Sequence, residues 1–255
     1  MRNIRLLIEY KGTNYTGWQI QPNLPTIQGI TQEKIKIITG EEVKLIAASR
    51  TDVGVHALGQ AANFHTESFI PTIPIQMGLN ALLPDDIVIK DAVEVSPDFN
   101  SRRHAIAKTY RYLILNRPYP SAIYRNFSWH VFQKLDIDAM KKAASYLIGK
   151  KDFTSFRAAD CDAPHPIKGI LCFSIETTPP VPLLTSSDET GLLAFEVKGT
   201  AFLRHMVRII VGTLVAVGKE KIKPDDFQAI INAKDRRLAG MTAPPQGLFL
   251  KEVEY

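Results

Sequence analysis

The residues in this sequence best suited to chemistry lie in one short polar segment. Asp52 and Arg50 stand two positions apart, directly after the apolar run 43–48, and Gly54 follows them. A carboxylate can act as a nucleophile, a general base or a metal ligand, and a neighbouring guanidinium keeps it ionised. Glycine beside them frees the backbone for a turn. We therefore predict that a strand ends here in a functional turn that carries Asp52.

The surroundings of Asp52 argue against several kinds of site. His56 lies on the same turn but belongs to no ligand cluster, and Cys161 with His165 is an isolated pair, so we expect no metal. The spacing over residues 212–219 is wrong for a phosphate-binding loop, and we expect no nucleotide cofactor. A hydrolase acting on sugar or phosphate would need a second carboxylate from elsewhere in the chain. A purely structural turn with an ion pair is the other open alternative.

The distribution of charge is more informative than its total. The chain has 31 Lys and Arg against 26 Asp and Glu, a net charge of +5, which is too small to identify a nucleic-acid partner. No acid occurs between Asp98 and Asp136. The cations of this basic run are Arg102, Arg103, Lys108, Arg111, Arg117, Arg125 and Lys134, and its aromatic residues are Phe99, Tyr110, Tyr112, Tyr119, Tyr124, Phe127, Trp129 and Phe132.

Such a mixture is typical of an RNA-binding surface, because cations neutralise phosphates and aromatic faces stack on unpaired bases. A strand with a solvated basic face and a buried aromatic face is the open alternative. A second acid-free run lies between Glu196 and Glu220. In it Arg204, His205 and Arg208 stand near one another at helical spacing, which predicts a cationic helix face. We expect the two runs to line one cleft.

The length of 255 residues and a hydrophobic content of 45% predict a well-buried globular protein with one large or two medium domains. Two cysteines, Cys161 and Cys172, do not make a disulfide framework and favour a reducing, cytoplasmic compartment. The first residues alternate charged with apolar side chains, and charged residues bracket the longest later apolar run. We therefore expect no export signal and no membrane span.

Periodicity and turn residues predict an α+β fold with two similar halves, residues 1–105 and 106–255. Strands are expected at 4–10, 43–48, 59–65, 87–95, 108–116, 168–177, 191–198 and 247–254, and helices at 26–39, 75–82, 136–148 and 202–217. The pairing partner of the last strand is left unassigned. Residues 178–190, with three prolines, are expected to form an exposed loop.

Residues 49–57, with Gln60, resemble the G-R-T-D-x-G-V-H-A motif of tRNA pseudouridine synthases of the TruA type. Further segments match the same family in order along the chain: 10–12 with 17–19, 108–112, 152–157, 202–208 and 242–248. Six ordered motifs that extend nearly from end to end are far more specific than any single one. They favour an enzyme over a purely structural reading of the turn.

The resemblance implies an isomerase that converts uridine to pseudouridine at positions 38, 39 and 40 of the tRNA anticodon stem-loop. It implies tRNA as the partner, no cofactor and no metal, and a homodimer. It also implies two domains whose antiparallel sheets join across a basic RNA-binding cleft, with helices on the outer faces. A noncatalytic tRNA-binding or RNA-folding protein that keeps the cleft is the alternative that the two basic runs leave open.

The resemblance also assigns roles to four residues. Asp52 is the nucleophile, adding either to the base or to the sugar. Tyr110 stacks on the target uracil and is the candidate base for the C5 proton, although a phenol with a pKa of about 10 needs help in that role. Arg208 pairs with Asp52, and Arg50 occupies the space of the displaced base or contacts the RNA backbone. Ser49 departs from the family's usual glycine, and residues 99–103 depart from its usual F-x-A-R-F.

Overall fold

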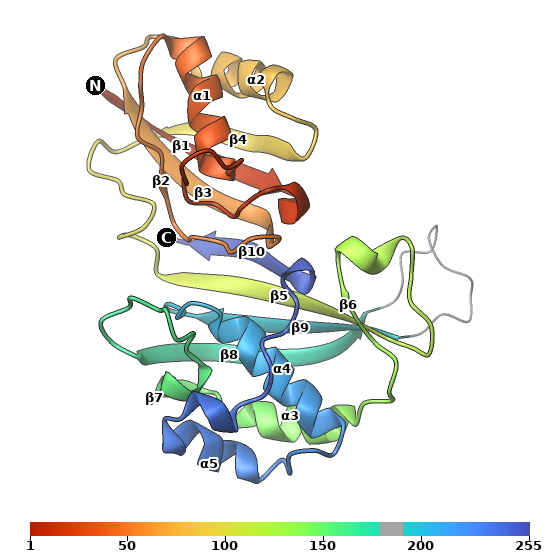
Figure 1. Ribbon diagram of the computed structural model, residues 1–255. Helices are drawn as coiled ribbons and strands as arrows, with labels where there is room; N and C mark the ends of the chain where they lie inside the picture. The colour runs from red at the N-terminus through yellow and green to blue at the C-terminus, as the bar shows by residue number, and fades with distance from the viewer. Residues whose placement is uncertain (179–190) are drawn as a thin grey trace. The chain divides into compact units, whose positions relative to one another are not determined.

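A computed structural model describes residues 1–178 and 191–255, which form two compact units (Figure 1). Unit 1 comprises residues 1–108 and 249–255, and unit 2 comprises residues 109–248. Each unit combines helices with β-strands, which confirms the predicted α+β class. The expected loop at 178–190 falls outside the described residues, except that Thr178 ends a strand.

Unit 1 contains strands in the order β4-β1-β3-β10, with β2 added on β3. Their bounds are β1 (Arg2–Tyr10), β2 (Ile46–Ala47), β3 (His56–Thr66), β4 (Ile87–Val95) and β10 (Leu248–Glu254). β1 pairs antiparallel with both β3 and β4, whereas β10 pairs parallel with β3, placing Phe249 opposite His56. The last strand, whose pairing partner the sequence did not indicate, therefore lies in the sheet of unit 1.

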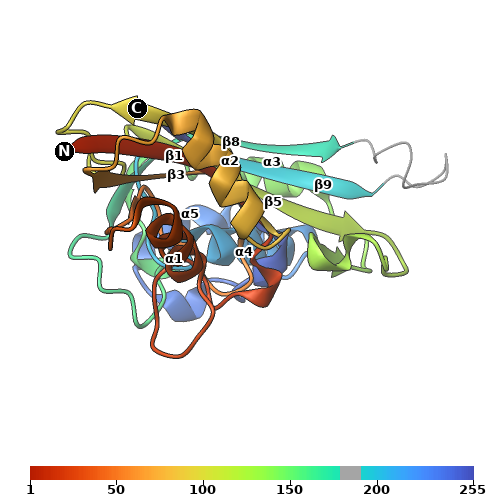
Figure 2. The same cartoon turned by 90° about the horizontal axis from the view of Figure 1, so that it is seen from above.

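Two helices belong to unit 1, α1 (Ile27–Thr39) and α2 (Thr72–Leu82). Local residues set the bounds of α1: the Thr26 hydroxyl accepts the Gly29 N–H at 3.3 Å, and Gly40 ends the helix at a φ of 76°. Figures 1 and 2 both show α1 beside the strands of this unit. Its buried Ile27 and Ile35 join the core, as the predicted periodicity requires.

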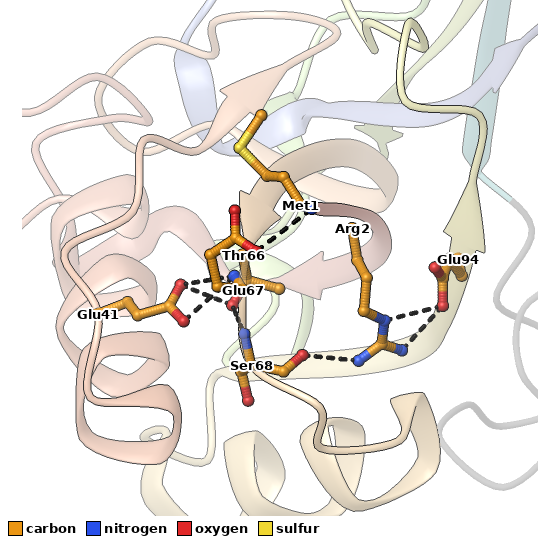
Figure 3. Close-up of polar contacts among 7 residues, drawn as sticks. All are labelled: Met1, Arg2, Glu41, Thr66, Glu67, Ser68 and Glu94. Atoms are coloured by element: carbon orange, nitrogen blue, oxygen red, sulfur yellow. Dashed lines mark hydrogen bonds and ion pairs between the residues drawn. The ribbon is translucent and has the colours of Figure 1, made fainter.

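Polar side chains fasten the strands of unit 1 where β1 begins (Figure 3). The Arg2 guanidinium pairs with Glu94 of β4 at 2.8 Å and donates to the Ser68 carbonyl at 2.9 Å. Glu41, just after α1, accepts a hydrogen bond of 2.7 Å from the Thr66 hydroxyl. These contacts tie the ends of β1, β3 and β4 to one another and to α1.

Unit 2 contains strands in the order β5-β9-β8-β7, with β6 added on β5. Their bounds are β5 (Ala107–Asn116), β6 (Trp129–Val131), β7 (Gly149–Asp152), β8 (Ile167–Thr178) and β9 (Leu192–Gly199). β8 pairs antiparallel with β7 and β9, while β6 pairs parallel with β5. Each unit therefore includes one parallel pair in addition to the predicted antiparallel pairs.

The helices of unit 2 are α3 (Ile137–Ser145), α4 (Met206–Gly218) and α5 (Asp226–Ala233), the last of which periodicity did not predict. Short 3₁₀ helices in the two units cover Gly12–Asn14, Tyr124–Asn126, Thr154–Phe156, Arg236–Leu238 and Pro245–Gly247. Nearly every residue of α4 is buried, and both views show this helix against the strands of its unit (Figures 1 and 2). Within the described ranges, no helix is both long enough and apolar enough to cross a bilayer.

One predicted feature of α4 is wrong. The sequence placed Arg204, His205 and Arg208 on one helical face, but α4 begins only at Met206. His205 precedes it with a φ of 60°, in the left-handed region that cannot continue a right-handed helix. Arg204 instead forms an ion pair with Asp160 at 2.6 Å. Of the three, only Arg208 belongs to the helix.

Candidate active site

Asp52 opens a tight turn immediately before β3. The Val55 N–H donates to the Asp52 carbonyl at 3.1 Å, and Gly54 takes a φ of 75° at the third position. A side chain is strained at that angle, so glycine suits this place in the turn. The Asp52 side chain is half-buried, whereas Arg50 is exposed. Asp52 is therefore only partly accessible to solvent.

A loop of unit 1 lies directly behind this turn. The Trp18 N–H donates to the Thr51 carbonyl at 3.0 Å, and Trp18 itself is buried. A Cβ at Gly17 would lie 2.6 Å from the Thr51 carbonyl oxygen, and a Cβ at Gly12 would lie 1.9 Å from that of Val55. Only glycine permits so close an approach of two backbones. The family motif at residues 10–19 is thus a support for the Asp52 turn.

Two side chains complete this support. The Tyr10 and Thr51 hydroxyls form a buried hydrogen bond of 2.7 Å. The Gly12 N–H donates to His56 Nδ1 at 3.0 Å, and the His56 ring stacks on Phe249 with 4.7 Å between centroids. A ring nitrogen that accepts carries no proton, so this bond requires the tautomer protonated on Nε2. His56 therefore links β3 and β10 to the loop at residues 10–19. Within the described ranges, no group of three or more His, Cys, Asp or Glu side chains could hold a metal ion.

The segment that leads to Asp52 is held from two further directions. Gln60, fully buried on β3, accepts the Ser49 N–H at 3.3 Å and donates to the Ser49 carbonyl at 2.7 Å. Lys108 Nζ donates to the Ala48 carbonyl at 2.6 Å. Burial lowers the pKa of Lys108 to about 8, and the positive charge of Arg102 adds to this effect. Both contacts act on backbone atoms rather than on the Asp52 carboxylate.

Tyr110 lies in β5 of unit 2 and is buried, with 6% of its surface exposed. Its ring meets the Phe202 ring edge to face, at 5.1 Å between centroids and 82° between planes. Phe202 belongs to the segment that precedes α4, so the contact joins two of the family motifs. The stacking of Tyr110 on a base stays a prediction.

Arg208 projects from the first turn of α4 and is half-buried. Its Nε donates to the Ala243 carbonyl at 2.7 Å, and the Ala243 N–H donates to the Arg208 carbonyl at 3.1 Å. Further along, a Cβ at Gly212 would lie 1.8 Å from the Met241 carbonyl oxygen. The backbone of the 242–248 motif therefore lies directly on α4 and orients the Arg208 side chain.

Tyr112 connects the same motif to β5. Its hydroxyl donates to the Pro244 carbonyl at 2.7 Å, and a Cβ at Gly247 would lie 2.6 Å from its ring. Burial raises the pKa of the Tyr112 phenol. In the 152–157 motif, the Ser155 hydroxyl donates to the Ile230 carbonyl at 2.6 Å. These family motifs of unit 2 are thus contacts between neighbouring segments.

The basic run divides into two groups. Three of its cations are engaged by the protein: Lys108 by Ala48, Arg111 by Glu196 at 2.8 Å, and Arg117 by the Tyr119 ring at 4.5 Å. Four cations are exposed, namely Arg102, Arg103, Arg125 and Lys134. Its aromatic residues divide likewise, since Tyr110 and Tyr112 are buried whereas Tyr119 and Phe132 are 55% and 64% exposed. Strand β5 therefore has the buried aromatic face that was the alternative to an RNA-binding surface. The exposed cations and aromatic residues of the basic run remain suited to binding RNA.

The four residues predicted for the site lie two in each unit. Asp52 and Arg50 share the segment before β3, and Tyr110 and Arg208 lie on β5 and α4. The proposed pairing of Arg208 with Asp52 stays a prediction. Sequence reasoning missed the supporting roles of Tyr10 and Lys108, although both lie in matched motifs. Their motif positions were the available signal, but no spacing rule indicates which backbone atom such a side chain contacts.

A family model described as tRNA pseudouridine synthase matches residues 6–102 and 143–255 of the chain. Proteins from Acetivibrio thermocellus and Caldicellulosiruptor bescii are each 49% identical to it, and one from Thermoanaerobacter sp. (strain X514) is 47% identical. All three are described as tRNA pseudouridine synthase A, and each match spans 100% of both chains. A solved dye-decolorizing protein from V. cholerae aligns over 88% of both chains at a TM-score of 0.22 and 12% identity, too low a score to indicate a common fold.

Proposed function

The chain belongs to the tRNA pseudouridine synthase family, and from that membership we propose that Asp52 is the nucleophile of its reaction. The protein is an isomerase that converts uridine in tRNA to pseudouridine. The observation that carries the role of Asp52 is its position. The one acid of the matched motif lies half-buried on a turn that buried side chains and two close glycine contacts support from behind.

The reaction needs no net oxidant or reductant. The glycosidic bond between C1′ and N1 breaks, the base turns, and a bond forms between C1′ and C5. The C5 proton then leaves and N1 gains a proton, so substrate and product are isomers. Asp52 forms a transient covalent bond to the base or to the sugar, which holds the reacting fragments together while the base turns.

The target base must first leave its stack, at a cost of a few kcal/mol. We propose that Tyr110 stacks on the uracil and accepts the C5 proton. Arg208 pairs with Asp52 and keeps that carboxylate ionised and oriented. Arg50, which is exposed beside the turn, fills the space of the displaced base or contacts the RNA backbone.

We also propose the finer features of the substrate and assembly. The uridines are those at positions 38, 39 and 40 of the anticodon stem-loop, and the exposed cations of the basic run bind the phosphates of that arm. The working form is a homodimer in the cytoplasm, a compartment that agrees with Cys161 and Cys172 both being free thiols.

The test measures tritium release from tRNA transcripts labelled at uridine C5 and maps pseudouridine by position. Wild type is compared with Asp52→Asn and with Asp85→Asn, which changes an exposed carboxylate of the same unit. We expect release confined to the anticodon arm, its loss in Asp52→Asn, and nearly normal tRNA binding by both variants. Full activity of Asp52→Asn would remove Asp52 from the nucleophile role. Salt-sensitive binding without release by wild type would favour a noncatalytic RNA-binding protein.

A further inference from the structure

Among the cations of the basic run, Lys108 makes the contact that differs most from what an RNA-binding residue would make. Its ammonium is engaged by the protein itself, because it donates to the Ala48 carbonyl at 2.6 Å. The side chain is partly buried, and among residues 1–178 and 191–255 no carboxylate forms an ion pair with it. Enclosing a cation without an opposite charge lowers the stability of a fold. A residue that lowers stability in this way suggests a functional reason for its presence.

The carbonyl that Lys108 holds belongs to the segment that ends at Asp52. Residues 48–52 have no regular secondary structure. Gln60 holds Ser49 and Tyr10 holds the Thr51 side chain, both through neutral hydrogen bonds. Lys108 supplies a charged donor, on the residue where the segment begins. Hydrogen bonds from charged donors are shorter and roughly twice as strong as neutral ones.

We propose that Lys108 is a positioning residue of the isomerase: by holding the Ala48 carbonyl, its ammonium sets the path of residues 48–52 and so the place of the Asp52 carboxylate. The proposal rests on the proposed role of Asp52 as nucleophile. Lys108 touches neither substrate nor reacting atoms in this role. Phosphate binding falls instead to exposed cations such as Arg102 and Arg103.

This role predicts a separation between stability and rate. Replacing Lys108 by methionine keeps most of the length of the side chain. It removes the enclosed charge, which offsets the loss of the bond to the Ala48 carbonyl, so the melting temperature should stay near that of wild type. The same change releases the Ala48 carbonyl and lets the segment shift. A displacement of about 1 Å at a reacting group can slow an enzyme about 100-fold. We therefore expect a slower reaction from an equally stable protein.

The experiment measures the single-turnover rate of tritium release, with enzyme in excess over tRNA labelled at uridine C5. Lys108→Met is compared with Lys90→Met, a matched control in the same unit. Lys90 also donates to a backbone carbonyl, that of Leu58 at 3.0 Å, but it is exposed and pairs with Glu9 at 3.2 Å. We expect Lys108→Met to be about 10- to 100-fold slower at saturating enzyme, with unchanged tRNA affinity. Lys90→Met should react at the wild-type rate.

A pH profile gives a second readout. In wild type the Lys108 ammonium loses its proton as the pH rises through about 8, which weakens its bond to the Ala48 carbonyl, so the rate should fall there. Lys108→Arg keeps a charged donor throughout this range. We expect it to recover most of the rate and to lack that fall. Should Lys108→Met fail to fold, the comparison of wild type with Lys108→Arg decides, and identical profiles would overturn the proposal.

Other results would also overturn it. They are a wild-type rate in Lys108→Met, an equal loss in Lys90→Met, or a loss that disappears at saturating enzyme because only tRNA binding was weakened. Asp52→Asn separates this proposal from the one on which it rests. If Asp52→Asn is active, the nucleophile assignment fails. If it is inactive while Lys108→Met is normal, only the role of Lys108 fails.

Discussion

Unit 1 and unit 2 hold their candidate residues by different means. Asp52 lies on an irregular segment fixed by directed hydrogen bonds from Trp18, Gln60 and Lys108. Tyr110 and Arg208 lie on a strand and a helix, and α4 is buried along nearly its whole length. Hydrogen bonds contribute little net stability but set atomic positions, whereas apolar burial supplies stability. Changes around the Asp52 turn should therefore lower activity more than stability, and changes in the core of unit 2 should do the reverse.

The largest effect on stability is expected in unit 2. Phe227 of α5 is fully buried and stacks on Phe156 at 5.7 Å between centroids. Phe227→Ala should lower the free energy of unfolding by about 3–5 kcal/mol, measured by urea denaturation, because it leaves a cavity. The single-turnover rate of the folded fraction at low temperature should stay near that of wild type. A rate that falls tenfold or more would contradict the expectation that changes in the core of unit 2 affect stability more than activity.

Gly12→Ala tests the support behind the Asp52 turn. The added Cβ would lie 1.9 Å from the Val55 carbonyl oxygen, so two backbones must move apart at a cost of about 1–3 kcal/mol. Since Val55 closes the turn, the rate should fall strongly as well. Gly59→Ala is the control, because its Cβ would meet the Lys251 carbonyl oxygen at 2.6 Å between β3 and β10. Equal losses of rate in the two variants would contradict the proposal that the loop at residues 10–19 supports the Asp52 turn.

Gln60→Leu sharpens the comparison within unit 1. It removes both hydrogen bonds to Ser49, and we expect a loss of about 1–2 kcal/mol with a clear fall in the single-turnover rate. Gln28→Leu is a matched control. Gln28 is also buried and bridges two backbone groups, the Ile20 N–H and the Leu45 carbonyl. A similar loss of stability with a normal rate is expected there, and an equally slow Gln28→Leu would show that rate merely follows stability.

The smallest effects are expected from two tyrosines. Tyr10→Phe removes the hydroxyl bonded to Thr51, and Tyr112→Phe removes the one bonded to the Pro244 carbonyl, both at 2.7 Å. Each should cost about 0.5–1.5 kcal/mol by urea denaturation. The rate should fall further in Tyr10→Phe than in Tyr112→Phe, since only the former acts on the Asp52 turn. A larger fall in rate for Tyr112→Phe would show that the reaction depends more on the Tyr112 contact in unit 2.

Elements set by neighbouring residues were predicted well. The Thr26 cap and Gly40 stop delimit α1, and alternating side chains give β4 its observed bounds. Elements that depend on distant contacts were predicted less well. The run at 43–48 keeps only two residues as a strand, and α4 begins later than expected because His205 adopts a left-handed backbone. In neither case do the side chains adjacent in sequence indicate where the element begins or ends.

The candidate site divides in the same way. The residue types and order around Asp52, and the ordered motifs that accompany it, were sufficient to indicate a tRNA pseudouridine synthase. They were also sufficient to name Asp52, Arg50, Tyr110 and Arg208 as candidates. The supports of the turn were not predictable. Lys108 was assigned to RNA because it lies in a basic run, and its bond to Ala48 joins residues 60 positions apart.

The sequence by itself therefore determined the fold class, the family and the residues suited to chemistry, because these depend on side-chain type, order and local periodicity. Only the tertiary structure decided that β10 joins β3 and that Gly12 and Gly17 lie against the Asp52 turn. It also decided which cations of the basic run bind backbone atoms and which face solvent. Such contacts form when distant parts of the chain return to one another, and their geometry is set by packing rather than by neighbours in sequence.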